Sequence, residues 1–560
     1  MDRIIEVREA DCRSCYRCIR HCALKAISCR EDRTEILREE CVYCGRCVLE
    51  CGRGARAVTD DRPEIERAIA AGEKVYVSAA PSFPAAFGGI NLFQLSAALK
   101  KLGFAGVEET AVGAERVTRA YEELIAAHAM PNIITSSCVS LNLLIQKHYP
   151  SLLPQLAPVL TPALAHAKML RAVYGSRAKV VFVGPCIAKK AEVGKGLFAA
   201  LTFAQLKSWL EERNIGFDGE DRSARGVRAR KIRYFPASGG IAANLRRELR
   251  AEYETVAVDG MEECIEALDA LAAGRLNGCF LEMNVCRGGC LGSAVMRQMG
   301  ISVLQGREQI KAYAHSLCEA EAPLTDGLRG DYSAHYRSLR RKPAPVPEEL
   351  IESALRSMGK TGAGDLLNCG CCGYETCRDK AVAIVQGKAS PDMCVSHMRR
   401  KAEDRADAVF EHTPLALLLT DEAGRIERCN AAAVRLFGSD RLEGCDVSAL
   451  GLPIVRPEGA LTDVREVSLP ERGIYAEMTT VAMPYNRTLL YLFQDRADRE
   501  RAREELRRVR EESIRAAQTA MRRQTETVQR IASLLGEAAA DSRAAVDGLI
   551  SAVEREERER

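Results

Sequence analysis

Eight cysteines near the amino terminus repeat in register, and their spacing suits iron–sulfur chemistry. The pattern C-x2-C-x2-C-x3-C occurs twice, 29 residues apart. Three thiolates at these spacings can bind one corner of a [4Fe-4S] cluster, while the fourth cysteine of each run reaches the other cluster. Two structural zinc sites are the alternative, since zinc also binds paired cysteines. We expect one cluster on Cys12, Cys15, Cys18 and Cys51, and a second on Cys41, Cys44, Cys47 and Cys22.

This amino-terminal segment resembles a bacterial two-cluster ferredoxin domain. It departs from that family where a proline usually follows the fourth cysteine, because Ala23 and Gly52 stand there. The departure removes no ligand. Cys29 lies outside the repeat, and we interpret it as a spare thiol.

Four further cysteines follow short apolar runs in the middle of the chain. Runs such as KVYVSAAP, PNIITSSC, KVVFVGPC and LNGCFLEMN alternate with helical stretches such as LFQLSAALKKLG, which is typical of an α/β domain. Such folds place ligand sites in loops at the carboxyl ends of strands. We therefore expect four thiolates to converge on one more [4Fe-4S] cluster: Cys138, Cys186, Cys286 and Cys290.

Three loops around these cysteines, TSSCVS, GPCIAKKAE and FLEMNVCRGGCLG, resemble the signature loops of the iron-only, or [FeFe], hydrogenases. The resemblance runs from about residue 74 to about residue 336. In that family the four cysteines hold a cubane, and one of them bridges to a diiron unit that carries carbon monoxide, cyanide and an azadithiolate. The resemblance implies that Cys290 is the bridge and that Lys189 hydrogen-bonds a cyanide ligand. Gly288 and Gly289 would let the backbone approach the cluster closely.

Three positions depart from the catalytic members of that family. Ser137 stands where a cysteine relays protons to the diiron unit, Val139 replaces a proline, and Asn284 replaces a methionine. A thiol with a pKa near about 8.5 exchanges protons far more readily than a serine hydroxyl, so we expect slow turnover. The carboxylate proton path of the family has candidates here that cannot be assigned: Glu115, Glu122 and Glu123.

Two remaining features of this domain allow structural interpretations. Glu192 could lie behind the site or on a solvated helix, and ASGGI at Ala237 to Ile241 reads as a tight strand-to-helix turn rather than an anion-binding helix start. We interpret three cysteines without partners at ligand spacing as buried apolar residues: Cys264, Cys279 and Cys318.

A third cysteine group follows the basic, proline-bearing linker RRKPAPVPEE. Its spacing C-x2-C-x4-C-x16-C, with helical RDKAVAIVQG inside it, resembles a small cubane-binding domain of electron-transport complexes and corrinoid iron–sulfur proteins. Zinc is again the alternative, and Cys371 could replace a neighbouring ligand. We expect a [4Fe-4S] cluster on Cys369, Cys372, Cys377 and Cys394.

The next segment, LALLLTDEAGRIERCNAAAVRLFG, reads as a strand, a turn, a second strand and a helix, and it resembles the start of a PAS domain. Asp421, Gly424 and Asn430 stand at the usual places, and the sheet should close near Asp495. Cys429 and Cys445 are interpreted as core thiols, with no heme or flavin ligand among them or His412. A charged helix follows, which could be solvated or could form a dimer seam in a homodimer.

These patterns predict a multidomain α/β and α+β protein. The formal charge of +3, from 80 basic and 77 acidic residues, gives no reason to expect a nucleic acid or membrane partner. No apolar run is long enough for a membrane span, and the opening MDRIIEVREADC carries charges where a signal peptide needs an apolar stretch, so we expect a cytoplasmic location. There the clustered cysteines would stay reduced and favour metal ligation over disulfides. We expect domains at residues 1–62 (ferredoxin), 63–340 (hydrogenase-like), 341–400 (linker and small [4Fe-4S] domain), 401–495 (PAS) and 496–560 (helical signalling tail).

The combination resembles the sensory branch of the [FeFe] hydrogenases. It implies an oxidoreductase that splits dihydrogen slowly, exchanges protons, passes electrons through its clusters and signals through the PAS domain and tail. The implied partners are a redox protein such as ferredoxin, a downstream kinase or phosphatase, and the hydrogenase maturases. The alternatives are a catalytic ferredoxin-linked hydrogenase and an iron–sulfur relay or assembly protein without the diiron unit.

Overall fold

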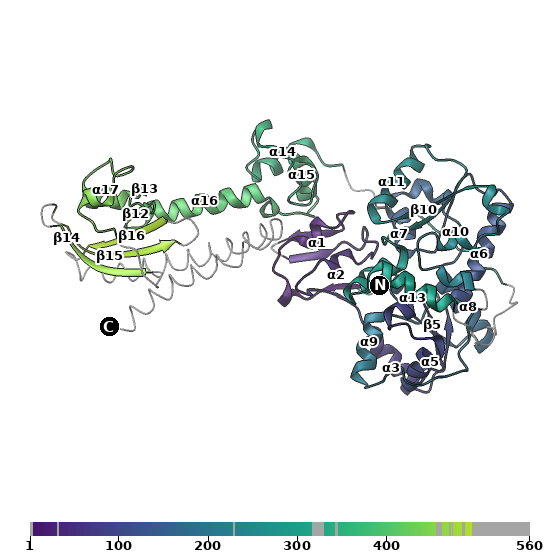
Figure 1. Cartoon of the computed structure of the whole chain (residues 1–560). Coiled ribbons are helices and arrows are strands. Elements are labelled where there is room, and N and C mark those ends of the chain that lie inside the picture. The colour runs from purple at the N-terminus through teal and green to yellow at the C-terminus, as the bar shows by residue number, and fades with distance from the viewer. Residues whose placement is uncertain are drawn as a thin grey trace. The chain divides into compact units, whose positions relative to one another are not determined.

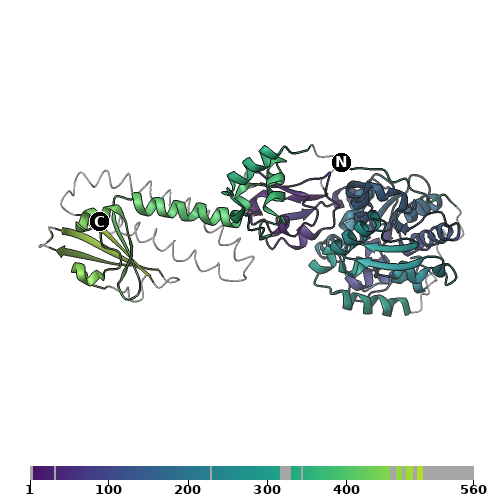
Figure 2. The ribbon, with the colours of Figure 1, turned by 90° about the horizontal axis from the view of Figure 1, so that it is seen from above.

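The computed structural model describes residues 4–30, 33–227, 230–315, 330–341, 345–454, 462–469, 472, 474–483 and 488–495. The chain forms two compact units, residues 1–12 with 17–345 and residues 13–16 with 346–560 (Figures 1 and 2). Both contain helices and sheets, which confirms the predicted multidomain α/β and α+β class. The expected tail helix at 496–560 and Cys318 lie outside the described residues.

The amino-terminal repeat folds as two intertwined halves. Each short sheet pairs a strand of one half with a strand of the other, so β1 pairs with β4 and β2 with β3, all antiparallel. Neither half can therefore form its sheet alone. The elements are β1 Ile5–Val7, α1 Arg17–Arg20, β2 Ile27–Arg30, β3 Arg33–Ile36, α2 Arg46–Leu49 and β4 Arg56–Val58.

The two halves also share unusual backbone conformations at equivalent positions. Three residues of the first half have a positive φ, and so do the three residues 29 positions later. Only two of these six are glycines, although the left-handed region is costly for other residues. The turns around the cysteines therefore impose the same backbone path twice. The pairs are Ser14 (48°) and Tyr43 (56°), Tyr16 (58°) and Gly45 (79°), and Lys25 (50°) and Gly54 (66°).

The central domain contains two parallel sheets, as its apolar runs predict. The order of the first sheet is β6-β5-β8-β9, and the order of the second is β10-β11-β7. Helices cover them (Figure 1). The strands are β5 Val75–Ala79, β6 Gly106–Glu109, β7 Ile133–Ile134, β8 Lys179–Gly184, β9 Ala199–Thr202, β10 Glu254–Asp259 and β11 Cys279–Asn284.

Several helices of this domain begin at side-chain caps. Asn91 and Gln94 form a capping box, and Thr161 accepts a hydrogen bond from the Leu164 amide just before Pro162. Such caps satisfy amides that the helix cannot. The helices are α3 Arg62–Ala70, α4 Phe83–Ala86, α5 Leu92–Lys101, α6 Ala111–Ala126, α7 Val139–His148, α8 Pro162–Tyr174, α9 Phe203–Glu212, α10 Gly240–Asn244, α11 Met261–Ala272, α12 Ala294–Gln298 and α13 Val303–His315.

The ferredoxin-like segment packs directly on the central domain. A Cβ atom at Gly45 would lie only 2.6 Å from the Ile187 side chain and 2.9 Å from that of Ala294. These two side chains already fill the space. Lys147 donates a hydrogen bond to the Cys41 carbonyl at 2.6 Å. The loop that carries the second cysteine run is thereby held against the central domain.

The second unit joins a small helical domain to a PAS-like sheet. Helix α16 is continuous between the two parts (Figure 1). The sheet (Figure 2) is antiparallel with the order β13-β12-β16-β15-β14, and β16 ends at Asp495, the last described residue. The elements are α14 Glu348–Ser357, α15 Cys377–Val385, α16 Val395–His412, β12 Ala416–Thr420, β13 Ile426–Cys429, α17 Ala431–Phe437, β14 Thr462–Leu469, β15 Ile474–Met483 and β16 Thr488–Asp495.

The isolated cysteines differ in their burial. Cys264 and Cys279 are buried as expected, whereas Cys445 is exposed and is not a core thiol, because its turn lies at the domain surface. Within the ranges given above, no helix combines the length and the apolar character that a membrane crossing needs.

The packing at Gly45 can be tested against a matched control. We expect Gly45→Ala to lower stability more than Gly54→Ala. Both residues have a positive φ, which costs alanine about 1 kcal/mol, but only a Cβ at residue 45 meets other atoms within 4 Å. Overpacking should add about 1–3 kcal/mol at Gly45. Thermal unfolding of both full-length variants is the measurement, and equal losses would contradict the packing.

Candidate metal centres

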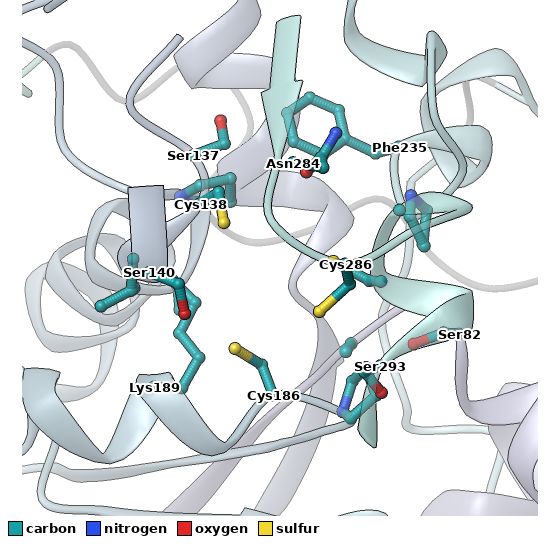
Figure 3. Close-up of a pocket in the computed structure, with 18 of the residues that line it drawn as sticks. Ser82, Ser137, Cys138, Ser140, Cys186, Lys189, Phe235, Asn284, Cys286 and Ser293 are labelled. Carbon is teal, nitrogen blue, oxygen red and sulfur yellow. The ribbon is translucent and has the colours of Figure 1, made fainter. Parts of the chain in front are cut away.

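Four cysteines line one pocket in the central domain. Cys138, Cys186, Cys286 and Cys290 surround a cavity of about 100 Å³. In Figure 3 the sulfur atoms of Cys138, Cys186 and Cys286 point into the same space. The structure therefore brings together the four side chains that we expected to converge at the ends of the strands.

The pocket lies where the carboxyl ends of strands from both parallel sheets meet. Cys138 follows β7 and precedes α7, and Cys186 follows β8 and precedes the 3-10 helix η3 (Ile187–Glu192). Cys286 and Cys290 follow β11, with Cys290 inside the 3-10 helix η6 (Gly289–Gly292). Thiols from distant parts of the chain are therefore positioned by the rigid ends of strands.

The pocket is lined mostly by apolar atoms, and this disfavours the charged state of the thiols. Burial, as the largest cause, and the neighbouring thiols together raise the pKa of Cys186 to about 11 and that of Cys290 to about 12. The pKa of Cys286 is raised well above its ordinary value for the same two reasons. Thiolates are disfavoured here unless positive charge binds between them. A cationic iron–sulfur core would supply that charge, so the donor set fits such a group.

Two polar side chains at the pocket also fit a polar ligand. Ser82 is fully buried, and its hydroxyl has no hydrogen-bond partner within the described part of the chain. Lys189 lines the pocket too, and it is only 7% exposed. A buried hydroxyl without a partner is costly, so a ligand atom that accepts or donates there is expected.

Lys189 has a carboxylate partner of its own. Its Nζ lies 2.9 Å from Oε2 of Glu192, and Thr161 donates to the other oxygen at 2.7 Å. All three residues are buried. The sequence left open whether Glu192 lies behind the site or in solvent, and the structure places it behind Lys189.

The turn that the paired glycines form gives a further reason for glycine at both positions. Gly288 and Gly289 have φ of +83° and +71°, which favours glycine. A Cβ at these positions would meet Val303 and the Pro236 carbonyl at 2.5 Å. The glycines are thus required by the turn and by protein atoms packed against it. The Cys290 amide donates to the same Pro236 carbonyl at 2.8 Å, which fixes this cysteine.

Ser137 belongs to a neutral hydrogen-bonded group. Its hydroxyl lies 3.0 Å from the hydroxyl of Tyr121, which also contacts Ser136. Figure 3 shows the Ser137 hydroxyl directed away from the Cys138 sulfur. Tyr121 is fully buried, and burial raises its pKa. Sequence reasoning missed Tyr121, because nothing local links it to a serine 16 residues later.

The carboxylates proposed from sequence as proton carriers do not border the pocket. Glu115 pairs with Arg119, and Glu122 accepts from the amide and side chain of Arg246. Glu123 is exposed. None of the three is among the residues that line the cavity.

A buried acid that the sequence did not single out lies close by. Burial raises the pKa of Glu282 to about 7, against hydrogen bonds that lower it. It accepts from the Ala242 amide at 2.8 Å and lies 3.5 Å from Asn284, which lines the pocket. The ASGGI segment is therefore not a strand-to-helix turn, since a 3-10 helix (Arg230–Tyr234) precedes it and its amides face Glu282.

Of the crossed arrangement expected from the repeat, the described interactions include Cys22 of the first run beside the second run. The thiol of Cys22 acts electrostatically on Cys41 and Cys44 of the other half. Burial, as the largest cause, raises the pKa of Cys41 to about 11 and of Cys44 to about 12. Cys44 also lines the central pocket beside Cys286. The second cysteine run therefore lies next to the central thiols.

Arg56 provides buried positive charge in this segment. Its Nη2 donates to the Cys18 sulfur at 3.4 Å, and the thiols of Cys47 and Cys12 are near. Its Nη1 is buried and has no partner among the described residues. An anionic cluster beside Arg56 would satisfy this donor, which supports the fit.

The carboxyl-terminal thiols line a separate small pocket. The lining includes Cys369, Cys372, Cys377 and Cys394, the predicted set, and it does not include Cys371. Lys380 and Lys360 line it as well and are 1% and 6% exposed. The pKa of Cys394 is lowered overall. Burial alone would raise it, but hydrogen bonds from Ser396 and from a backbone amide, together with the charge of Lys380, outweigh burial. These residues also fit an anionic cluster.

Nowhere in the described ranges do three or more His, Cys, Asp or Glu side chains approach closely enough to hold a single metal ion. A cubane is wider than one ion, so its ligands lie farther apart than those of zinc.

Three family matches cover these regions. Residues 73–294 match the iron-only hydrogenase large subunit, C-terminal domain, residues 367–396 match a putative Fe-S cluster domain, and residues 405–470 match a PAS domain. The chain thus contains an iron-only hydrogenase domain, an Fe–S domain and a PAS domain. No curated protein matches the chain.

Solved structures with similar folds include hydrogenases and PAS domains. One shows stepwise H-cluster assembly in an [FeFe]-hydrogenase, at 16% identity and a TM-score of 0.39, covering 50% of this chain and 99% of that one. An [FeFe]-hydrogenase variant from Chlamydomonas reinhardtii gives 16% and 0.40, covering 50% and 100%. The PAS domain of a nitrogen regulation protein from Vibrio parahaemolyticus gives 20% and 0.15, covering 16% and 96%.

These families imply iron–sulfur cofactors and oxidoreductase chemistry, and their combination indicates a hydrogenase-related sensory protein with redox and signalling partners.

The ligand set of the carboxyl-terminal pocket has a built-in control. We expect Cys372→Ser to lower the iron and sulfide content by about four atoms each per chain, because a cubane needs all four thiolates. Cys371→Ser should leave both unchanged, since Cys371 is not in the pocket lining. Iron and acid-labile sulfide analysis of the full-length protein is the measurement. The assignment fails if the two variants lose iron equally.

Proposed function

We propose that this protein is a dihydrogen-sensing [FeFe] hydrogenase with low turnover. The observation that carries the proposal is the pocket in which four thiols, Lys189 and the unpartnered Ser82 hydroxyl surround one cavity, with Ser137 where a fast proton donor would be needed. The presence of a PAS domain in the same chain supports a sensory role.

The proposed cofactors are four [4Fe-4S] clusters and a diiron unit with carbonyl, cyanide and azadithiolate ligands. Cys290 would bridge the central cubane to the diiron unit, and Lys189 and Ser82 would contact its ligands. The remaining ligand sets are those inferred from spacing: Cys12, Cys15, Cys18 and Cys51; Cys41, Cys44, Cys47 and Cys22; Cys138, Cys186, Cys286 and Cys290; and Cys369, Cys372, Cys377 and Cys394.

When bound, the diiron unit would supply the site where dihydrogen is cleaved. The chain supplies everything around that reaction. Lys189 is held by Glu192 at the mostly apolar pocket, where its ammonium group would hydrogen-bond strongly to an anionic ligand. The apolar lining excludes water, which strengthens each electrostatic contact.

Low turnover follows from the groups at Ser137. Its only described hydroxyl neighbour is Tyr121, a buried phenol whose pKa is raised. Neither a serine hydroxyl nor a phenol gains or loses a net proton readily at neutral pH, so Ser137 and Tyr121 cannot replace a thiol as the proton donor and acceptor at the site. A protein that reports dihydrogen needs binding and slow exchange rather than high flux.

Electrons have a continuous route toward a partner. Cys44 lines the same pocket as Cys286, so the second amino-terminal cluster would lie beside the central one. Close packing at Gly45 keeps this arrangement rigid. A redox partner such as ferredoxin would exchange electrons through the amino-terminal domain.

The output route begins at the carboxyl-terminal pocket. Cys394 is the N-cap of α16, and this helix ends against the PAS domain. There the Asn430 side chain donates to the Phe410 and Leu415 carbonyls at 3.0 and 2.8 Å, and Arg428 pairs with Asp407 at 2.6 Å. A change at the cluster could thus bias the PAS domain through one helix. A kinase or phosphatase would read that change in the cytoplasm, and maturases would install the diiron unit.

One observation favours a second candidate, an iron–sulfur relay without the diiron unit. Lys189 already has a buried carboxylate partner at 2.9 Å, so its charge does not require a cyanide. Such a protein would keep the four cubanes but would neither cleave nor exchange dihydrogen.

Restoring a thiol at the Ser137 position tests the cause of low turnover. We expect Ser137→Cys to speed hydrogen evolution by about tenfold or more, because positioned proton transfer contributes at least that much. Ser140→Cys places a thiol in the same pocket at a different position and should not speed the reaction. Hydrogen production with a chemical reductant is the measurement. If neither thiol, or both equally, raised the rate, proton supply at Ser137 would not be limiting.

Coupling to the PAS domain predicts a change along α16. Backbone amides of Val395–His412 should exchange with deuterium at different rates under dihydrogen and under argon, since reduction of the adjacent cluster alters the helix start. Cys372→Ser, which removes a proposed ligand of that cluster, should abolish the difference. Hydrogen-exchange mass spectrometry is the measurement, and identical protection of the unsubstituted protein under both gases would exclude this route.

A further inference from the structure

A chain of polar side chains leads from the central pocket to a partly exposed tyrosine. Thr110 lines the pocket, and its hydroxyl lies 2.7 Å from that of Ser78. The Ser78 hydroxyl lies 2.8 Å from Nδ1 of His166. Nε2 of His166 is 3.5 Å from Oε2 of Glu108, and Tyr174 donates to the other Glu108 oxygen at 3.0 Å. Each member thus contacts the next.

This chain runs through the interior and ends at the surface. Ser78 and His166 are fully buried, and Thr110 and Glu108 are 5% and 3% exposed. Tyr174, the last member, is partly exposed and stacks on Tyr76. Protons could therefore reach solvent from the pocket without an open channel.

The fold holds these five residues in place. Ser78 and Glu108 are paired residues on the neighbouring parallel strands β5 and β6, and Thr110 follows β6 directly. His166 comes from α8, which packs against α6 at Gly113. A Cβ at Gly113 would lie 2.2 Å from the Pro162 carbonyl and 2.8 Å from His166, so glycine permits the approach.

A second chain runs from Ser137 through Tyr121 and Ser136 to the partly exposed Tyr336, but it consists of hydroxyls alone and holds no histidine or carboxylate. Tyr121, which contacts Ser137, is fully buried. Glu282 is also buried, and its hydrogen bonds go to backbone amides and to Asn284. The proton path through carboxylates expected from family resemblance has no members at this pocket.

We propose that Thr110, Ser78, His166, Glu108 and Tyr174 form the proton relay of this protein. The inference deepens the proposed function, on which it rests, by naming the groups that carry the proton of dihydrogen to solvent. Histidine suits the central place because one ring nitrogen can accept a proton while the other releases one.

The transfer conserves protons and moves no electrons. Outward, Thr110 takes a proton from the pocket and gives its own to Ser78, which gives its own to Nδ1 of His166. Nε2–H then releases a proton to Glu108, and Glu108 passes one to water or to Tyr174, whose own proton leaves. Each bond formed matches a bond broken. The His166 ring must return to its first tautomer before it can transfer the next proton. This additional step is consistent with slow turnover.

Exchange between deuterium gas and water tests the relay in the full-length, cofactor-loaded protein. We expect Thr110→Val and Ser78→Ala to slow the formation of HD and H2 by about tenfold or more, because each removes one hydroxyl link with little change in volume. Thr110→Ser, which keeps the hydroxyl, should restore the rate. Thr118→Val is the matched control in α6, the helix that Thr110 precedes, since the hydrogen bond described for the Thr118 hydroxyl goes to the Ala114 carbonyl.

A second readout does not depend on the rate. In infrared difference spectra between dihydrogen- and argon-treated protein, a carboxylic acid band of Glu108 should appear, vanish in Glu108→Gln and be lost in Thr110→Val and Ser78→Ala. A purely structural role for the hydroxyls would leave this band in place. Iron content and melting temperature should match those of Thr118→Val.

The outcomes separate the two proposals. Unchanged exchange in Thr110→Val and Ser78→Ala, while Glu282→Gln slows it, would overturn the relay and leave the proposed function standing. Absence of exchange and of the carboxylic acid band in the unsubstituted, cofactor-loaded protein would overturn both. Slow exchange with rescue by Thr110→Ser would support the relay.

Discussion

The structure depends on the convergence of four thiols on one mostly apolar pocket. Bringing Cys138, Cys186, Cys286 and Cys290 together from two sheets places groups that repel one another as thiolates in a medium that disfavours charge. The arrangement is favourable only when a cation binds between them. The rigid strand ends, the glycine turn at Gly288 and the packing of the ferredoxin-like segment all serve to hold this cluster of sulfurs.

The same constraint explains the positive charges that recur near each cysteine group. Lys189 lies at the central pocket, Arg56 at the amino-terminal thiols, and Lys380 and Lys360 at the carboxyl-terminal pocket, and all are buried. Buried cations without anions are unfavourable, so these residues and the proposed clusters stabilise each other. The proposed electron path follows from this pattern. Cys44 of the amino-terminal group lines the central pocket, and α16 begins just after Cys394 of the carboxyl-terminal group.

Sequence predicted those features that local spacing encodes. The repeated cysteine runs, the strands that end before Cys138, Cys186 and Cys286, and the turn between Asp421 and Gly424 could be read because each depends on neighbours in the chain. Tyr121 beside Ser137, Glu282 behind Asn284 and His166 beside Ser78 could not, since tertiary packing joins residues with no common motif. The interpretation of ASGGI failed for this reason, because its partner is a carboxylate about 40 residues later.

The central claim is that the pocket holds a diiron unit in addition to a cubane. Infrared spectroscopy of the full-length protein, produced together with hydrogenase maturases, tests it most directly. The account predicts absorption bands of metal-bound carbonyl and cyanide that shift on exposure to dihydrogen. Protein that carries about sixteen irons in cubanes but lacks these bands would contradict the account and identify the chain as an iron–sulfur relay.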